Sequence, residues 1–428
     1  MSTKNVPTCE RSNVPTFLRP DDKQRVLVVF GTRPEAIKLA PVIRALQAWP
    51  DQFVARTCAT AQHREMLDQA LAPFGIVPDI DLDLMQPGQT LSALGARVLA
   101  AMDEVLAAEQ PDWVLVQGDT TTVMMAALAA QHRQVKVGHV EAGLRTYDRR
   151  NPFPEEMNRV VADHVSDLCF APTETARRNL LAEGIPDERI IVTGNTVIDA
   201  LLWVASQPPP VEMAEFLEGL GIGEKMEKQG APGTQGDKEK LSPSPLLPLS
   251  PSPHLILVTA HRRESFGAPL AGICRALRQL SEELAGRAHI IYPVHRNPNV
   301  WGPVHAALAG LPGITLLPPV DYRSLVYLMA RAALILTDSG GIQEEAPSLH
   351  VPVLVLRETT ERPEAVAAGA ARLVGTDPAH IVAAVHELLN DPVGYARMAS
   401  AANPYGDGRA AERIAEALLA TARPQPQP

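Results

Sequence analysis

The sequence of 428 residues has few cysteines, and none of them lies at the spacing of a metal site. Its four cysteines are Cys9, Cys58, Cys169 and Cys274, and no two of them form a CxxC pair. This pattern argues against a disulfide framework and a structural zinc site, and it is typical of a reducing compartment. We therefore expect a cytoplasmic protein that binds no metal.

The sequence also lacks an apolar run close to the roughly 20 residues that a membrane-spanning helix needs. Residues 1–24 contain acidic side chains and no apolar segment, so we expect a disordered polar extension and not a signal peptide. Acidic residues outnumber basic ones by 49 to 39, which gives a net charge of -10. Such a charge argues against a surface that follows nucleic-acid phosphates, so neither a membrane nor a nucleic acid is an expected partner.

Cofactor-binding motifs are missing as well. The sequence contains neither GxGxxG nor GxxxxGK[ST], and no lysine has the context of a pyridoxal phosphate site. Nicotinamide, ATP and pyridoxal chemistry therefore have no support. We expect an enzyme without an organic cofactor, whose own side chains carry out the chemistry.

Short runs of valine, isoleucine and leucine recur along the chain, each followed by a turn and a helical pattern. This alternation predicts βαβ units with parallel sheets. The expected strands of the first half are 26–30, 113–117, 135–140, 167–171 and 189–193, with helices such as 35–48 and 91–108 between them. Those of the second half are 255–260, 289–294, 314–318, 333–337, 352–356 and 371–374.

The length exceeds what one hydrophobic core usually organises, so two domains are expected. The fold class is predicted as α/β, with two doubly wound Rossmann-like domains that face a central cleft. We place the domains at residues 25–205 and 254–400. The junction at 206–253 includes a segment rich in proline, glycine and serine, 228–253, which cannot bury enough apolar surface to order itself.

The end of the chain is predicted to hold one more helix, at residues 401–420, which could pack back on the first domain. Residues 421–428 are expected to be a disordered tail.

Charged and glycine-containing clusters follow the predicted strands, where open parallel sheets bind their ligands. After strand 26–30, Pro34 can start a helix, and Arg33 and Lys38 flank its positive end. This arrangement predicts an anion site. The alternative is a capped helix with solvated charges.

A second candidate anion site follows strand 333–337. The small residues Ser339, Gly340 and Gly341 would let backbone N–H groups approach a phosphate at the start of a helix. Glu345, expected in the first turn, could accept hydrogen bonds from ribose hydroxyls. Alternatively, these acidic residues only complement the helix dipole. Arg362, in a later charged loop, could bind a phosphate in bidentate fashion or be solvated.

Acidic residues follow strands of the first half. Asp119 comes after strand 113–117, Glu141 comes after 135–140, and Glu155 lies next to Glu156 in a nearby loop. We expect these carboxylates to meet at one cleft, because the ends of parallel strands lie along one edge. Closely spaced carboxylates shift each other's pKa values apart, as acid–base chemistry uses.

Two histidines follow strands of the second half, His261 after 255–260 and His295 after 289–294. A lone histidine is usually structural. His261 lies next to Arg262 and Arg263, however, where it is placed to meet an oxyanion or a leaving phosphate.

Several ordered segments closely resemble the non-hydrolysing UDP-N-acetylglucosamine 2-epimerases. The segments are GTRPEAIKLAP (31–41), AQHREMLD (61–68), GDTTT (118–122), GHVEAGLRT (138–146), PEEMNR (154–159), PTETARRNLL (172–181), VTGNTVIDAL (192–201), HRRESFG (261–267), PVHRNPNV (293–300), TDSGGIQEEAPSL (337–349) and TERPEA (360–365). The resemblance extends from about residue 26 to 420. It implies the GT-B fold, a homodimer, and interconversion of UDP-GlcNAc and UDP-ManNAc for surface polysaccharide synthesis.

The resemblance also implies roles for individual residues. Arg33 and Lys38 would lie near the diphosphate, and His261 would assist the departing UDP. The sugar would be served by Asp119, Glu141 and Glu155, and the phosphate and ribose by Ser339, Gly340, Gly341 and Glu345, with Arg362 close by. The positions that would contact the nucleotide base correspond to Val320 and Leu325. A second, activating UDP-GlcNAc would bind at Gln62, His63, Arg64 and Arg263, although Glu65 replaces a glutamine there.

This chemistry suits the residues, because the C2 hydrogen of the sugar is not next to a carbonyl. Elimination of UDP from C1 would give a neutral glycal, and re-addition would invert C2 if proton-transfer groups lie on two faces. Three alternatives remain: a hydrolysing epimerase that releases ManNAc, a GT-B glycosyltransferase, and an inactive nucleotide-sugar sensor.

Overall fold

The structure is a computed structural model that describes residues 23–60, 64–86, 88–222 and 253–422; for 64–66 and 422 only the backbone is described. The predicted tail falls almost entirely outside these residues, as do nearly all of the predicted extension and the proline- and serine-rich insertion. Within the described part of the chain, no helix is both long and apolar enough to cross a membrane.

The first half of the chain forms a fully parallel seven-stranded sheet with the order β3-β2-β1-β4-β5-β6-β7. The strands are β1 (Gln24–Phe30), β2 (Phe53–Ala59), β3 (Ile80–Asp81), β4 (Trp113–Gln117), β5 (Lys136–Val140), β6 (Leu168–Ala171) and β7 (Ile190–Val192). Helices cover both faces, as the doubly wound fold requires.

Strand β1 shows how the sequence sets these two layers. Val26, Val28 and Phe30 face one side, while Leu27 and Val29 face the other, because successive side chains of a strand alternate. The first side packs against α1 (Arg33–Gln47), α2 (Arg64–Leu71), α7 (Thr196–Ala205) and α16 (Ala410–Ala422). The second packs against α3 (Leu91–Glu109), α4 (Thr121–His132) and α5 (Glu155–Val165), while α6 (Glu174–Ala182) covers β6 and β7.

The second half forms a parallel six-stranded sheet with the order β10-β9-β8-β11-β12-β13. Its strands are β8 (His254–Thr259), β9 (Ala288–Pro293), β10 (Ile314–Leu317), β11 (Ala332–Thr337), β12 (Val353–Val355) and β13 (Ala371–Leu373). One face packs against α9 (Ala268–Glu283), α10 (Pro298–Leu308), α14 (Pro378–Asn390) and α15 (Pro392–Ala399). The other carries α11 (Tyr322–Arg331), α12 (Gly340–Glu345) and α13 (Pro363–Ala367).

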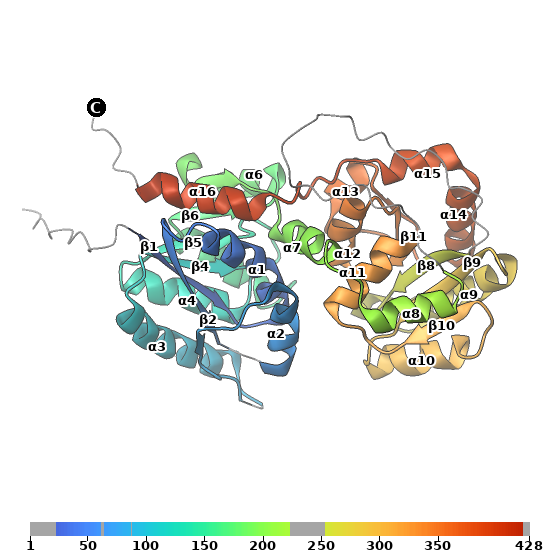
Figure 1. Cartoon of the computed structure of the whole chain (residues 1–428), viewed down its shortest axis with the longest axis horizontal. Helices are drawn as coiled ribbons and strands as arrows, with labels where there is room; N and C mark the ends of the chain where they lie inside the picture. The colour runs from blue at the N-terminus through green and yellow to red at the C-terminus, as the bar shows by residue number, and fades with distance from the viewer. Residues whose placement is uncertain (1–22, 61–63, 87, 223–252, 423–428) are drawn as a thin grey trace, which may run out of the picture.

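The two halves lie side by side and are joined through α7 (Figure 1). Helix α7 belongs to the core of the first half, and it also contacts α11 and α12 of the second half. One apolar cluster therefore runs without a break from the first sheet into the second. After α7 the chain enters α8 (Val211–Gly219), and near its end it returns to the first half, where α16 packs on α1 and α7.

Each strand expected from the sequence is present, with ends that differ by at most two residues. Strand β2 was not predicted, because Arg56 and Thr57 interrupt its apolar run and part of it is only half buried. Strand β3 has two residues, too few for any periodicity to appear.

Candidate active site

Both sheets reverse their strand order beside the first strand, and polar residues gather at these points. In the first sheet the reversal lies between β1 and β4, followed by Arg33 and Asp119. In the second it lies between β8 and β11, followed by His261 and Asp338. Such switch points are where open α/β sheets bind ligands, because the connections leave in opposite directions and open a crevice.

The start of α1 is closed by its own side chains. Thr32 Oγ1 accepts a hydrogen bond from the Glu35 N–H at 3.5 Å, and Glu35 Oε2 accepts from the N–H groups of Gly31 at 2.5 Å and Thr32 at 2.9 Å. Burial raises the pKa of Glu35 to about 7. Because this capping box uses N–H groups at the helix start, an anion here would depend on the side chains of Arg33 and Lys38.

Lys38 belongs to a buried charge cluster that spans the two halves. Its Nζ lies 2.5 Å from Glu141 Oε1. Asn195 Nδ2 donates to Glu141 Oε1 at 3.0 Å and to Glu344 Oε2 at 2.9 Å. Arg362 Nε in turn donates to Glu344 Oε1. Two carboxylates and two cations thus balance each other, with one amide bridging the halves.

Glu141 is held in this cluster in an unusual conformation. Its φ of 68° is left-handed, which a residue with a Cβ seldom adopts and which clusters at functional sites. Gln117 Nε2 donates to its second oxygen, Oε2. Burial alone would raise the pKa of Glu141, but Lys38, Arg362 and Asn195 outweigh it, so the pKa is lowered and the carboxylate is ionised. The same cluster raises the pKa of Lys38 despite its burial.

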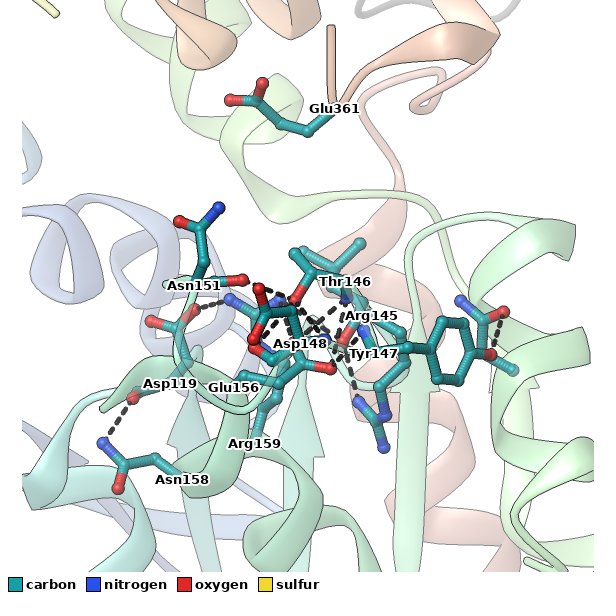
Figure 2. A network of polar contacts seen from close by, with 12 residues as sticks. Asp119, Arg145, Thr146, Tyr147, Asp148, Asn151, Glu156, Asn158, Arg159 and Glu361 are labelled. Carbon is teal, nitrogen blue, oxygen red and sulfur yellow. Dashed lines mark hydrogen bonds and ion pairs between the residues drawn. The ribbon is translucent and has the colours of Figure 1, made fainter. Parts of the chain in front are cut away.

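Asp119 is held by the helix that follows the next strand, as Figure 2 shows. Arg159 Nη2 of α5 donates to Asp119 Oδ2, and Asn158 Nδ2 donates to the Asp119 carbonyl at 2.8 Å. The Asp119 side chain keeps 32% of its surface exposed. Its carboxylate is therefore both fixed in position and accessible.

The adjacent acids Glu155 and Glu156 have different surroundings. Glu156 is buried and accepts hydrogen bonds from the N–H groups of Thr146 and Tyr147 at 2.9 to 3.2 Å (Figure 2). It holds the loop before α5. Glu155, the acid chosen from the sequence, begins α5 and is half buried. Only Glu155 is free of this structural task.

The acids predicted to pair with one another are instead paired with cations. Glu141 lies against Lys38, and Asp119 lies against Arg159. The expectation that neighbouring carboxylates set each other's pKa values is therefore wrong for Glu141, because a cation lies closer than any second acid.

His261 lies at the second switch point, with 42% of its side chain exposed. Its ring stacks on that of His295, with centroids 5.3 Å apart and 14° between the planes. Its Nδ1 lies 3.9 Å from Oδ1 of the buried Asp338. The two strand-end histidines are thus adjacent, a contact that was not predicted from the sequence.

The glycine-containing turn is confirmed as the start of a helix. Ser339 is the N-cap of α12, and its own N–H donates to Thr337 Oγ1 at 2.9 Å. A Cβ at Gly340 would lie 3.0 Å from Glu361 Oε1 and 3.2 Å from Arg262 Nη2. The close approach of this ion pair explains why glycine suits the position. Glu361 itself lies well away from the Asp119 network (Figure 2).

The placement of Glu345 in the first turn of that helix is wrong. Helix α12 begins at Gly340, so Glu345 is its last residue, and Pro347 follows directly in the 3₁₀ turn Ala346–Leu349. It therefore does not complement the positive end of the dipole. Tyr322 donates to its Oε1 at 2.7 Å, and burial raises the pKa of Glu345 to about 7.

The positions that the resemblance associates with a second ligand are only partly described. Gln62 and His63 lie outside the described residues, and only the backbone of Arg64 is described, at the start of α2. Arg263 is exposed in the 3₁₀ turn Arg263–Ser265. The positions associated with the base, Val320 and Leu325, are partly buried against the apolar core.

A cavity of about 610 Å³ lies between the halves but away from these residues. Its walls include Thr173 and Gly194 of the first half and Pro347 of the second, and none of the predicted catalytic residues lines it. Among the described residues, no group of three or more histidine, cysteine, aspartate or glutamate side chains could hold a metal ion.

Four residues of this region were missed from the sequence. They are Arg159, Asn195, Tyr322 and Asp338. Arg159 and Asp338 fall inside segments already singled out, PEEMNR and TDSGG, so their position beside the chosen acids was an available signal. Asn195 and Tyr322 act on residues 149 and 23 positions away, a relation that no local pattern reveals.

Comparison with known proteins identifies a family. A profile of UDP-N-acetylglucosamine 2-epimerases matches residues 44–419. The chain is 51% identical over 399 residues to the UDP-N-acetylglucosamine 2-epimerase of Salmonella typhimurium, covering 92% of this chain and 98% of that protein. The Escherichia coli K12 enzyme of the same name is 51% identical over 395 residues, with 92% and 98% covered.

Solved structures agree with the sequence comparison. The crystal structure of UDP-GlcNAc 2-epimerase from Neisseria meningitidis bound to UDP-GlcNAc is 44% identical, with a TM-score of 0.76 and 93% of this chain and 100% of that chain covered. The pair of parallel sheets is the GT-B arrangement predicted from the sequence. The chain therefore belongs to the UDP-N-acetylglucosamine 2-epimerase family.

Proposed function

We propose that this protein interconverts UDP-GlcNAc and UDP-ManNAc by inverting C2 of the sugar. Besides family membership, one observation carries the proposal. Asn195 bridges Glu141, one of the candidate acids of the first half, and Glu344 of α12, the helix that begins at the candidate phosphate-binding turn of the second half. A substrate with a sugar at one end and a nucleoside diphosphate at the other fits a site divided in this way.

The reaction requires elimination, because the C2 proton is too weakly acidic to be removed alone. A base takes the C2 proton while the bond from C1 to the diphosphate oxygen breaks, and the electron pair of that bond leaves with UDP. The intermediate is a neutral glycal. Return of a proton to the opposite face of C2, with re-addition of UDP at C1, gives the epimer.

The first half supplies the groups for proton transfer. Asp119 is accessible and fixed by Arg159, and we assign to it the C2 proton on one face. Glu141 and Glu155 would serve the other face and the sugar hydroxyls. An ionised carboxylate can accept the proton, and the acid formed can return it, so the reaction is reversible.

The second half would bind the leaving group. The N–H groups at the start of α12, with Ser339, Gly340 and Gly341, would bind a phosphate, and Arg362 would add its charge. Glu345 would accept hydrogen bonds from the ribose. From the first half, Arg33 lies close enough to Tyr322 to lower its pKa against the stronger effect of burial, and we assign Arg33 to the diphosphate.

We infer a cytoplasmic homodimer that uses UDP-GlcNAc and UDP-ManNAc and supplies surface polysaccharide synthesis. An activating second UDP-GlcNAc would involve Gln62, His63, Arg64 and Arg263.

Proton NMR in D2O tests the proposal. The protein is incubated with UDP-GlcNAc, and the anomeric and C2 signals are followed. We expect UDP-ManNAc to accumulate and deuterium to replace hydrogen at C2 of both sugars. Free ManNAc together with UDP would instead identify a hydrolysing epimerase. Absence of exchange without an acceptor sugar would overturn the proposal and favour a transferase.

A further inference from the structure

Asp338 is a fully buried carboxylate with one oxygen in use and one free. Its Oδ2 accepts hydrogen bonds from the N–H groups of His261 at 2.9 Å and Arg262 at 2.8 Å, and from Ser265 Oγ at 2.9 Å. Its Oδ1 is buried and has no hydrogen-bond partner in the described part of the chain. Since buried polar atoms are nearly always paired, this free oxygen requires an explanation.

The nearest ring nitrogen to that oxygen is Nδ1 of His261, 3.9 Å away. This distance is too long for a hydrogen bond but short enough to be closed by a small movement. The carboxylate cannot move, because three donors hold its other oxygen. The His261 ring can, because 42% of its side chain is exposed, with its ring stacked on that of His295.

We propose that Asp338 is a positioning residue for His261, whose Nδ1–H it holds through Oδ1 while Nε2–H faces the leaving diphosphate. The inference rests on the proposed function. As the C1–O bond breaks, its electron pair stays on the diphosphate oxygen, and the imidazolium donates its Nε2 proton to that oxygen. The proton returns to Nε2 when UDP re-adds to the glycal.

The position of Asp338 in the chain supports this role. It directly precedes Ser339 and Gly340, so the carboxylate that orients the histidine and the turn that binds the phosphate belong to one rigid segment. The segment follows β11, which pairs with β8, and β8 leads to His261. Neighbouring strands therefore fix Asp338, His261 and the candidate phosphate-binding turn relative to one another.

The charges around His261 oppose one another. Partial burial lowers the pKa of His261, and the charges of His295 and Arg262 lower it further, while Asp338 raises it. On balance the His261 pKa in the free protein lies below that of an ordinary imidazole. Contact with Oδ1 and the arrival of an anionic diphosphate both favour the imidazolium form that the step needs.

The substitution Asp338→Asn tests the inference. The amide must place its oxygen toward the three donors, which turns its NH2 toward Nδ1 and disfavours the imidazolium. We expect kcat to fall about a hundredfold, the lower end of what general acid catalysis contributes, and KM to change less than about threefold. The loss of kcat at high pH should move to lower pH, because the charge that raises the His261 pKa is gone.

A double-mutant cycle separates positioning from a structural role. If Asp338 acts through His261, Asp338→Asn should change kcat less than about twofold in a His261→Gln background. An equal loss in both backgrounds would overturn the inference. Thr259→Val is the control, because it removes a buried hydrogen bond to Thr337 at the same strand end, 2.6 Å long, without involving the pair.

NMR titration of the His261 ring gives a readout that needs no turnover. The His261 pKa should fall in Asp338→Asn and stay in place in Thr259→Val. An unchanged His261 pKa in a folded, UDP-binding Asp338→Asn protein would refute the contact. If the wild-type protein failed to epimerise its substrate, the proposed function would be wrong, while the titration would still report on the pair.

Discussion

The two halves of the site hold their charged groups in different ways. In the first half two of the three candidate catalytic acids have a cation against them, Lys38 for Glu141 and Arg159 for Asp119. In the second half Glu344 also lies against a cation, Arg362, but Asp338 is held by two backbone N–H groups and the Ser265 hydroxyl. The cations around Glu141 therefore keep that carboxylate ionised although it is buried, whereas the dipoles around Asp338 would form a rigid frame beside the leaving anion of the proposed reaction.

The largest effect on activity is expected from removing the accessible acid Asp119, which tests whether the first half carries out the proton transfer. Asp119→Asn should lower the rate of C2 exchange about a thousandfold, within the range of acid–base catalysis, because the amide cannot take a proton. Binding of UDP, measured by calorimetry, should change less than about threefold, since the proposed phosphate- and ribose-binding residues Ser339, Gly340, Gly341 and Glu345 lie in the other half.

The matched control replaces Asp112, an acid at the opposite end of the same strand, β4. Asp112 precedes β4 and accepts a hydrogen bond from the Arg25 N–H at 2.8 Å. Asp112→Asn should leave exchange unchanged. Loss of UDP binding together with exchange in Asp119→Asn would show that Asp119 is structural.

The next effect concerns stability. Lys38→Met leaves Glu141 buried with one cation fewer, which should lower the free energy of unfolding by about 3–5 kcal/mol. Urea denaturation measures the loss. The comparable change in the second half is Arg357→Met, whose partners Glu361 and Glu264 keep 31% and 53% of their side chains exposed. Because solvent screens that group, its loss should cost about 1 kcal/mol or less. Equal costs would remove the distinction between the halves.

The sequence predicted the frame of the fold better than the partners within it. Buried parallel strands such as β4 and β8 are continuous apolar runs, so they are visible without a structure. Strand β2 escapes notice because Arg56 and Thr57 break its run. The strand ends then located Asp119, Glu141 and His261, because ligands gather at that edge of a sheet.

The partners of these residues follow from the tertiary fold. Lys38 and Glu141 are 103 residues apart, and Asn195 and Glu344 are 149 apart. No local pattern links such pairs. Glu155 and Glu156 differ only in which side of α5 they face, so a sequence cannot tell the loop anchor from the candidate acid without knowing what the helix packs against.

The smallest expected effect is the pH dependence of stability, and it compares the two halves directly. Among the described residues, each half has one buried acid with a pKa of about 7. They are Glu35 at the start of α1 and Glu345 at the end of α12. Their ordinary pKa is 4.5, so the folded protein binds these protons more tightly than the unfolded chain. Each therefore contributes stability that is full below about pH 4.5 and is lost as the pH rises to about 7.

Replacing either acid by glutamine should abolish its share of this pH dependence. A shift from 4.5 to about 7 corresponds to about 3 kcal/mol between the two ends of the window. Urea denaturation at pH 4.5 and pH 8 should thus show a smaller difference for Glu35→Gln and Glu345→Gln than for the wild type. Glutamine can still cap α1, so Glu35→Gln should keep its helix.

The two variants should differ in their affinity for UDP. We expect the affinity to fall about tenfold for Glu345→Gln, because one charged hydrogen bond is lost, and to stay unchanged for Glu35→Gln. If both variants lost affinity equally, Glu345 would have no contact with the nucleotide beyond what Glu35 has.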